Sequence, residues 1–269
     1  MVTDEDRVDW VHRFGADTME ILDIGSGWGQ ASYLLAAKHN HNVTSLELIP
    51  ERAEFQEIRA SQEKLENLSV TNGNILDTNF DGKKFDLATL IGVLEWIGVD
   101  QRANDPREVQ KLALTRIHNL LKDDGKVCIG IENRIGFNNF LGARDHSGFS
   151  FTSLMPRWLA SAYLKMRNAS YRSNTSQNTY RTYTYSAAGY EKLLKECGFS
   201  DVEVLVSHPH YAHPRCLVPY KNSKVRSFFW RVYSPSAIKD VVFTNVFRLL
   251  SIFGLGHVFA PHFILLAKK

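Results

Sequence analysis

The segment ILDIGSGWGQ, Ile21 to Gln30, is the strongest indication of the fold in this sequence. A short apolar run containing an acid leads into three glycines at every second position, Gly25, Gly27 and Gly29. A strand that ends in a glycine turn before a helix is a nucleotide-binding arrangement, because glycine lets the backbone approach a ligand at the carboxyl ends of the strands. The dinucleotide pattern G-x-G-x-x-G would need glycine where the chain has Gln30, and the chain has no G-x-x-x-x-G-K-[ST] phosphate loop.

Around this stretch, residues 1–132 alternate between strand and helix patterns. Near-continuous apolar strands in a βαβα order predict a parallel sheet that is covered on both faces. The expected strands are residues 20–24, 42–47, 68–71, 85–92 and 126–132, and the expected helices are residues 5–14, 28–39, 50–65 and 105–121. Residues 1–132 are therefore expected to form the ligand-binding core of one α/β domain.

The alternation is interrupted twice in the second half of the chain. Residues 133–185 are rich in Asn, Ser, Thr, Tyr and Arg, with one expected helix near 156–166, and form a first insertion in the substrate region. Residues 186–207 return to the core as a helix and a strand. Residues 208–260 form a second, basic and aromatic insertion, and residues 261–269 form a closing strand. These are segments of a single domain.

A second set of polar residues follows the next two strands. Glu47 ends the second strand, twenty residues past Gly27, where a carboxylate can accept both ribose hydroxyls of an adenosine. Asn74 follows the third strand, where its amide can pair with the adenine edge. ILDIGSGWG, the strand-ending Glu47, GNIL at 73–76 and FDLATLIGVLEW at 85–96 together resemble the class I S-adenosylmethionine-dependent methyltransferases.

This resemblance implies a Rossmann-like sheet of seven strands in the order 3-2-1-4-5-7-6, with the last strand antiparallel. S-adenosyl-L-methionine is the implied cofactor, with Asp23 and Gly25 near its methionine amino group and Gly27 against its sugar. The turn is therefore not expected to hold a phosphate. The full set of expected cofactor contacts is Asp23, Gly25, Ser26, Gly27, Gly29, Gln30, Glu47, Leu48, Asn74, Ile75 and Ile91.

The expected chemistry is an in-line methyl transfer, for which the protein holds the acceptor close to the methyl group in a dry site. A hydroxyl acceptor also needs a base. Many small-molecule members of the family carry histidine directly after the glutamate in the loop past strand four, but this chain has Trp96 there, after Glu95. His146 is the first choice of base, with Asp145 as its ion-pair orienter or as a metal ligand.

Alternatives to this choice remain open. His146 can simply pack or cap its loop, Glu95 can be a capping residue, and His210 or His213 after strand six can supply the base. No metal is expected, because these histidines lack the close companions and cysteines of a zinc cluster. The expected substrate contacts are Trp96, Glu132, Asn133, Arg134, Arg181, Tyr183, Tyr185 and Arg215, with Arg181 gripping an anion.

The segments IENRIGFNNFLG, DHSGF, YRTYTYSAAGY and PRCLVPY resemble a bacterial methyltransferase subfamily whose members accompany glycosyltransferases of surface-polysaccharide pathways. This resemblance implies O-methylation of a sugar or another small hydroxylated acceptor, nucleotide- or lipid-linked. A non-catalytic cofactor-binding or assembly subunit of a glycan-synthesis complex is the alternative. An RNA methyltransferase is less favoured, because the loop after strand four lacks the motifs of nucleic-acid methyltransferases.

Charge is distributed unevenly along the chain. Residues 1–132 carry 23 acids and 14 bases, whereas residues 133–269 carry 6 acids and 18 bases. The basic half favours an anionic partner. Residues 215–260, basic and aromatic, are expected to be a substrate lid or an interfacial element that touches anionic lipid. The acidic amino terminus and three widely spaced cysteines predict a cytoplasmic protein, with or without peripheral membrane contact.

Overall fold

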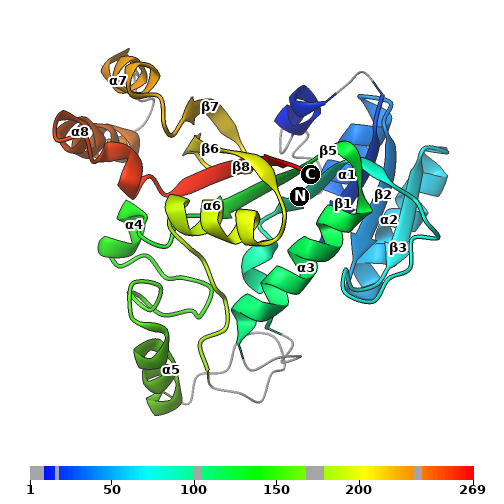
Figure 1. The fold of residues 1–269 in the computed structure, drawn as a ribbon, viewed down its shortest axis with the longest axis horizontal. Helices are drawn as coiled ribbons and strands as arrows, with labels where there is room; N and C mark the ends of the chain where they lie inside the picture. Colours follow the sequence, from blue (N-terminus) through cyan, green and yellow to red (C-terminus); the bar gives the residue numbers. More distant parts are fainter. Residues whose placement is uncertain (1–8, 16–17, 100–104, 168–178, 233–237) are drawn as a thin grey trace.

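The computed structural model describes residues 9–15, 18–99, 105–167, 179–232 and 238–269. Its centre is one eight-stranded sheet in the order β3-β2-β1-β4-β5-β8-β6-β7 (Figure 1). The strands are β1 (Glu20–Ile24), β2 (Asn42–Glu47), β3 (Leu68–Asn72), β4 (Phe85–Ile91), β5 (Leu121–Glu132), β6 (Ser200–Pro209), β7 (Pro214–Pro219) and β8 (His262–Lys268). Strands β1 to β5 run parallel, and β8 is antiparallel to both of its neighbours.

The expected strand order is confirmed, with β8 as the seventh strand of the pattern. The structure adds an eighth strand, β7, which pairs antiparallel with β6 at the edge of the sheet. Sequence analysis placed these residues in the second insertion. Pro214 and Pro219 bound β7, and prolines are tolerated at the ends of an edge strand because no neighbouring strand needs their missing N–H. The two prolines argued against a strand in the sequence, although they are compatible with one at the edge of the sheet.

Helices and 3₁₀ helices connect and cover the strands. They are η1 (Asp9–Phe14), α1 (Gln30–Ala37), α2 (Pro50–Gln62), η2 (Leu94–Trp96), α3 (Pro106–Leu120), α4 (Phe137–Phe140), α5 (Arg157–Met166), α6 (Ala187–Glu196), α7 (Ser223–Val232), α8 (Ile238–Ile252) and η3 (Gly256–Phe259). Local chemistry explains several starts. Asp105 caps α3 by accepting the backbone N–H of Arg107, and Pro50 and Pro106 occupy first-turn positions that need no donor.

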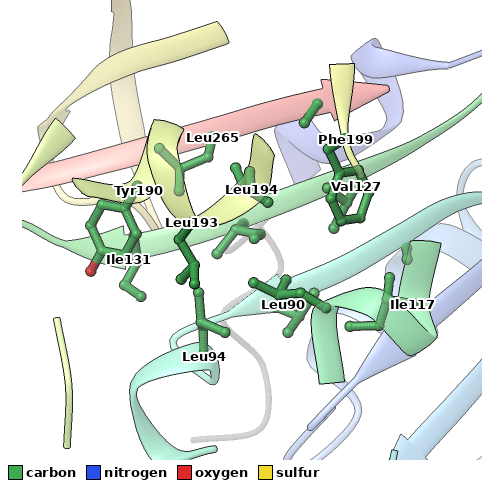
Figure 2. Close-up of a cluster of buried hydrophobic side chains, with 14 of the residues drawn as sticks. Leu90, Leu94, Ile117, Val127, Ile131, Tyr190, Leu193, Leu194, Phe199 and Leu265 are labelled. Atoms are coloured by element: carbon green, nitrogen blue, oxygen red, sulfur yellow. The ribbon is translucent and has the colours of Figure 1, made fainter. Parts of the chain in front are cut away.

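Two apolar clusters lie on the two faces of the sheet. On one face, α3 and α6 pack against β4, β5 and β8; Figure 2 shows Leu193 and Leu194 of α6 and Ile117 of α3 within this cluster. On the other face, Trp10 of η1 and Leu35 of α1 join a second cluster. Helices on both faces leave the ends of the strands as the open edges, which is where ligands bind in sheets of this kind.

The cysteines and the lengths of the helices bear on the expected cellular location. Cys128, Cys197 and Cys216 are free thiols. Among the helices that the structure describes, none has the length and apolar character needed to cross a bilayer. The expected helix at residues 5–14 is described only from Asp9, as η1, and residues 168–178 of the first insertion lie outside the described residues.

Candidate active site

The glycine turn between β1 and α1 depends on backbone conformations that favour glycine. Gly25, Gly27 and Gly29 have φ values of 64°, 63° and 76°, where a side chain would be strained. A Cβ atom added at Gly25 or Gly29 would also collide with Val93 or Gln56, whereas one added at Gly27 would meet no described atom within 4 Å. Gly27 therefore borders open space, and the other two glycines allow close packing.

Glu47 lies directly against this turn. Its Oε2 accepts the backbone N–H of Gly27 at 2.7 Å, and its Oε1 accepts the N–H of Ile49 at 2.9 Å. Arg52 lies 4.0 Å from the same carboxylate. A carboxylate has about four lone-pair directions, so these two bonds leave room for further donors such as ribose hydroxyls. Glu47 and the turn therefore face each other, and the contacts of both with a cofactor stay predictions.

A buried polar network supports the turn from below, and sequence analysis missed its main member. Gln56 of α2 donates from Nε2 to the carbonyl of Gly27 at 2.8 Å and to Ser26 Oγ at 2.9 Å. Ser45 of β2 lies 2.6 Å from both Ser26 Oγ and Gln56 Oε1. In the sequence, Gln56 is only a polar residue within a helical pattern. Its partners Ser26 and Gly27 lie in a different element, so nothing local indicates this role.

Asp23, expected near the cofactor amino group, is buried and already engaged. Its Oδ2 accepts Ser32 Oγ at 2.6 Å and its Oδ1 accepts Thr89 Oγ1 at 2.7 Å. Burial raises the pKa of Asp23, although the two hydrogen bonds act in the opposite direction. The carboxylate thus ties β1 to α1 and β4, and its contact with a ligand stays a prediction.

The other expected cofactor residues lie around the same strand ends. Asn74 follows β3 and its Oδ1 accepts the N–H of Leu76 at 2.9 Å, which forms a local turn. Gln30 begins α1 and Ile91 ends β4. Leu48 is exposed beside Glu47, and Ile75 is buried in the core. Their placement at one edge of the sheet agrees with the expectation, and their contacts with a cofactor stay predictions.

A second polar group lies at the ends of β4 and β5. Glu95 follows β4 in η2, Glu132 ends β5, and His146 lies in the loop after α4. Nε2 of His146 is 3.4 Å from Glu132 Oε2 and 3.6 Å from Glu95 Oε1. Trp96 lies beside them, with its ring 4.8 Å from the His146 ring. We call Glu95, Glu132 and His146 the carboxylate–histidine cluster.

Electrostatics inside this cluster are strongly perturbed. Glu95 is fully buried, and neither of its Oε atoms has a hydrogen-bond partner among the described residues. Burial, aided by the charge of Glu132, raises the pKa of Glu95 to about 8. Burial also acts on His146 and Glu132, but their mutual hydrogen bond and charges outweigh it, so the pKa of His146 is raised and that of Glu132 lowered. Shifts of this kind are typical of acid–base sites.

The same cluster has the composition of a metal site. Each of the three residues offers one ligand atom, and these atoms lie within 4.8 Å of one another. Histidine nitrogen and carboxylate oxygen are ligands that divalent metals accept. The arrangement can therefore handle a proton or hold a cation, whereas sequence analysis expected no metal.

Asp145 does not orient His146, contrary to the sequence expectation. Its Oδ1 accepts the N–H and the Oγ of Ser147, at 2.8 and 2.5 Å. Its Oδ2 accepts Thr152 Oγ1 at 2.8 Å and Tyr180 Oη at 3.1 Å. Side chains of neighbouring residues diverge along an irregular loop, so Asp145 braces the loop while Glu132 and Glu95 take the place beside His146.

Asn133 and Arg134, expected to touch substrate, hold the surrounding loops. Nδ2 of Asn133, which is buried, donates to the carbonyls of Val258 and Ala260 at 2.8 and 2.7 Å. Arg134 donates from Nε to the carbonyl of Ser153 at 2.8 Å and from an Nη atom to that of Met155 at 2.9 Å. These bonds bring the segments before β8 and α5 close to the end of β5.

The aromatic segment before α6 is also largely engaged. Arg181 is buried, and it donates from Nε to the carbonyl of Gly98 at 2.8 Å. Tyr185 Oη donates to Gln110 Oε1 at 2.7 Å, and the Arg157 guanidinium lies 4.1 Å from the Tyr183 ring. Burial raises the pKa of Tyr183 and of Tyr185. Arg215, on β7, is exposed.

Residues between β6 and β8 approach the cluster from the other side. Tyr211 Oη donates to Glu132 Oε1 at 3.3 Å, and its ring lies 5.5 Å from that of His262. The ring of His210 lies 4.3 Å from that of His262 in a tilted arrangement, and His262 is paired with Glu132 in the sheet. The structure therefore brings His210 near the cluster. His213 lies in the same turn, where its N–H donates to the carbonyl of His210.

Tyr211 and His262, which lie next to the cluster, are further residues of the candidate site that sequence analysis missed. Burial, aided by the charge of His210, lowers the pKa of His262 to about 3, so this ring is neutral at ordinary pH. Both residues lie in segments assigned to an insertion and to a closing strand, where nothing in the local pattern links them to Glu132. The antiparallel pairing of β8 with β5 brings His262 beside Glu132, and the turn after β6 brings Tyr211 to the same carboxylate.

Comparisons with known proteins agree with this fold. A family model described as a methyltransferase domain matches residues 16–153. Phosphoethanolamine N-methyltransferase 2 of Haemonchus contortus, in complex with S-adenosyl-L-methionine, is 18% identical, with a TM-score of 0.54 over 96% of this chain and 51% of that chain. This chain thus spans about half the length of that enzyme. No curated protein sequence matches the chain.

Two further structures have the same fold. A SAM-dependent methyltransferase from Archaeoglobus fulgidus is 13% identical, with a TM-score of 0.56 over 98% of this chain and 92% of that chain. A putative O-methyltransferase from Nostoc punctiforme is 14% identical, with a TM-score of 0.51 over 97% of this chain and 55% of that chain. At such identities the likeness shows the fold alone. The family match covers the glycine turn, Glu47 and the carboxylate–histidine cluster, and this chain belongs to the methyltransferase domain family.

Proposed function

We propose that the chain binds S-adenosyl-L-methionine at the glycine turn and transfers its methyl group to a hydroxyl of a sugar or a related small acceptor. The observation that carries this proposal is the carboxylate–histidine cluster at the ends of β4 and β5, on the same edge of the sheet as the turn. Ligands of parallel α/β sheets bind at this edge. Glu47 and Gly27 would hold the adenosine, and Glu95, Glu132 and His146 would face the reacting atoms.

S-adenosyl-L-methionine supplies an activated methyl group on a sulfonium. The protein has to align the acceptor oxygen with the carbon–sulfur bond and to accept the proton that the oxygen loses. In neutral His146, a proton on Nε2 would be held by Glu132, which leaves Nδ1 with the free lone pair. His146 would thus accept the hydroxyl proton at Nδ1, and Glu132 would stabilise the resulting imidazolium.

Glu95 would increase this effect once its own carboxyl, whose pKa is about 8, is ionised. Its fully buried carboxyl lies 3.6 Å from His146 Nε2, so a negative charge there would further favour protonated His146. Trp96 would cover one side of His146 and exclude water, in place of the histidine that many relatives carry. A hydroxyl acceptor needs such a base, which supports O-methylation. The structural relatives include both an N-methyltransferase and a putative O-methyltransferase.

A non-catalytic cofactor-binding or assembly subunit of a glycan-synthesis complex is a second candidate. The observation in its favour is Trp96, exposed at the position where a base would be expected. An RNA methyltransferase is supported only by the excess of basic residues in 133–269. These candidates differ in product: an assembly subunit forms no methylated product, and an RNA methyltransferase methylates RNA.

The decisive experiment incubates the protein with S-adenosyl-L-methionine labelled in the methyl group and with fractionated cell glycans. We expect label in a glycan fraction, in an alkali-stable ether linkage, and loss of this label in His146→Ala. His118→Ala, which changes a histidine on α3 outside the cluster, is the matched control. Label in RNA alone, or equal labelling by His146→Ala, would contradict the proposal.

A further inference from the structure

An exposed apolar surface lies at the junction of α4 and the end of α8. We call it the apolar rim, and it consists of Phe140, Leu141, Leu249, Ile252, Phe253 and Leu255. Ile252 is 77% exposed and Phe253 70%. The two parts of the rim are linked through Phe140 and Phe259, whose rings are 5.7 Å apart. Isolated apolar residues are normal on a surface, whereas a contiguous group of this kind marks an interaction site.

The larger part of the rim belongs to the end of α8 and to the turn after it. In Figure 1, α7 and α8 lie beyond the β6–β7 end of the sheet, far from β2 and β3. Residues 215–260 were expected to be either a lid or an interfacial element. Their helices contact each other, β7 and η3. This position leaves the end of α8 and the following turn exposed to a partner.

The surroundings of the rim are basic. No acidic residue occurs between Asp145 and Glu191 or between Glu203 and Asp240. Arg144 follows α4 and Lys224 lies in the first turn of α7, and both are exposed. Aromatic and aliphatic residues among basic ones fit the headgroup region of an anionic bilayer.

The rim is also connected to the candidate active site by a short segment and by hydrogen bonds. Helix α4 begins five residues after Glu132, the last residue of β5. Asn133 joins that strand end to η3 by its two bonds to the carbonyls of Val258 and Ala260. A surface seated on the rim would therefore lie close to the carboxylate–histidine cluster.

We propose that the apolar rim and its basic surroundings dock on an anionic membrane surface and that the methyl acceptor is a lipid-attached glycan. The second clause rests on the proposed function, whereas the first does not. A helix too short to span the bilayer can still insert one face at the interface. A second copy of this chain is a poorer occupant, because it would bring two basic surfaces together.

Sedimentation with vesicles tests the docking without any turnover. We expect binding to vesicles of phosphatidylglycerol and phosphatidylcholine, weaker binding to phosphatidylcholine alone, and a decrease as salt rises. Ile252→Ser with Phe253→Ser should weaken binding by about tenfold or more. The matched control is Ile58→Ser with Leu112→Ser, which changes exposed residues of α2 and α3. Arg144→Gln with Lys224→Gln should weaken only the salt-sensitive part of the binding.

Three results would overturn the docking: no sedimentation at low salt, equal binding by rim and control variants, or a concentration-dependent dimer that the rim variant loses. Thermal unfolding and calorimetry with S-adenosylhomocysteine verify that the rim variant is folded and still binds ligand. With a labelled lipid-linked glycan and its water-soluble glycan as acceptors, the rim variant should lose methylation of the first only. Equal loss on both acceptors would contradict a lipid-attached substrate, and no methylation by the parent protein would instead reject the proposed function.

Discussion

Nε2 of His146 lies 3.4 Å from Oε2 of Glu132, although 14 positions separate the two residues in sequence. Glu132 ends β5, and His146 is held in place by a loop that Asp145 and Arg134 brace. Adjacent residues in that loop therefore have different contacts: Asp145 stabilises the loop, and His146 faces Glu95 and Glu132. The orientation of His146, the proposed base, therefore depends on the end of a strand and not on its neighbour in sequence.

The pH dependence of methyl transfer should report on this pair. His146 must be neutral to accept a proton, and its pKa is raised above the ordinary value by Glu132 and Glu95. The rate should therefore increase with pH through an apparent pKa above 6.5 and be lost as pH falls below it. In Glu132→Gln this limb should move to lower pH, because the charge that holds the proton on His146 is gone.

The variants His146→Ala and Glu132→Gln separate catalysis from cofactor binding. His146→Ala should lower kcat by about 10² to 10⁴-fold, the usual contribution of a general base. Binding of S-adenosylhomocysteine should change little in either variant, because neither residue is expected to contact the cofactor. A pH profile of Glu132→Gln that coincides with the parent profile would exclude Glu132 as the orienting group.

Removal of metal ions should leave methyl transfer unchanged. The cluster has a composition that a metal ion can accept, but the proposed base needs only a proton-accepting histidine. Dialysis against a chelator followed by an assay without added metal tests this point. Activity that disappears on chelation and returns with Mn²⁺ or Zn²⁺ would assign the cluster to metal binding instead.

Ligand binding at the glycine turn can be tested with a pair of matched glycines. Gly27 and Gly82 have φ values of 63° and 76°, and a Cβ atom at either would meet no described atom within 4 Å. Arginine at either position carries a similar backbone strain of about 1–2 kcal/mol. Calorimetry should show that Gly27→Arg abolishes binding of S-adenosylhomocysteine while Gly82→Arg retains it. Retained binding in both variants would show that S-adenosylhomocysteine does not bind at this turn.

Much of the fold could be predicted because strands buried on both faces leave continuous apolar runs in the sequence. The runs that became β1, β4 and β5 are examples, and the positive φ values at Gly25 and Gly27 explain why the turn is recognisable too. Strand β7 could not be predicted, since its pairing with β6 depends on tertiary position and its bounding prolines argue against a strand. Local patterns carry burial and turn geometry but not edge pairing.

The candidate site was predictable only in part, for the same reason. Glu47 and Gly27 lie at the ends of adjacent strands, so strand order alone brings them together. The pairing of His146 with Glu132, and of Tyr211 with the same carboxylate, depends on how loops after β5 and β6 fold back. Asp145 was misassigned because its neighbours Ser147 and Thr152, which capture its carboxylate, carry no distinctive signal.

Asn133 should be important for stability although it was expected to bind substrate. Its buried side chain donates to the carbonyls of Val258 and Ala260 and accepts the N–H of Ile135 at 3.1 Å. Alanine would leave these backbone groups without partners, at a cost of about 2–4 kcal/mol in the free energy of unfolding. Urea unfolding of Asn133→Ala, with the exposed Asn138→Ala as control, measures this difference. A loss below about 0.5 kcal/mol, the level of an ordinary surface substitution, would show that the bridge between β5 and η3 contributes nothing to folding, and would return Asn133 to the expected role at the substrate.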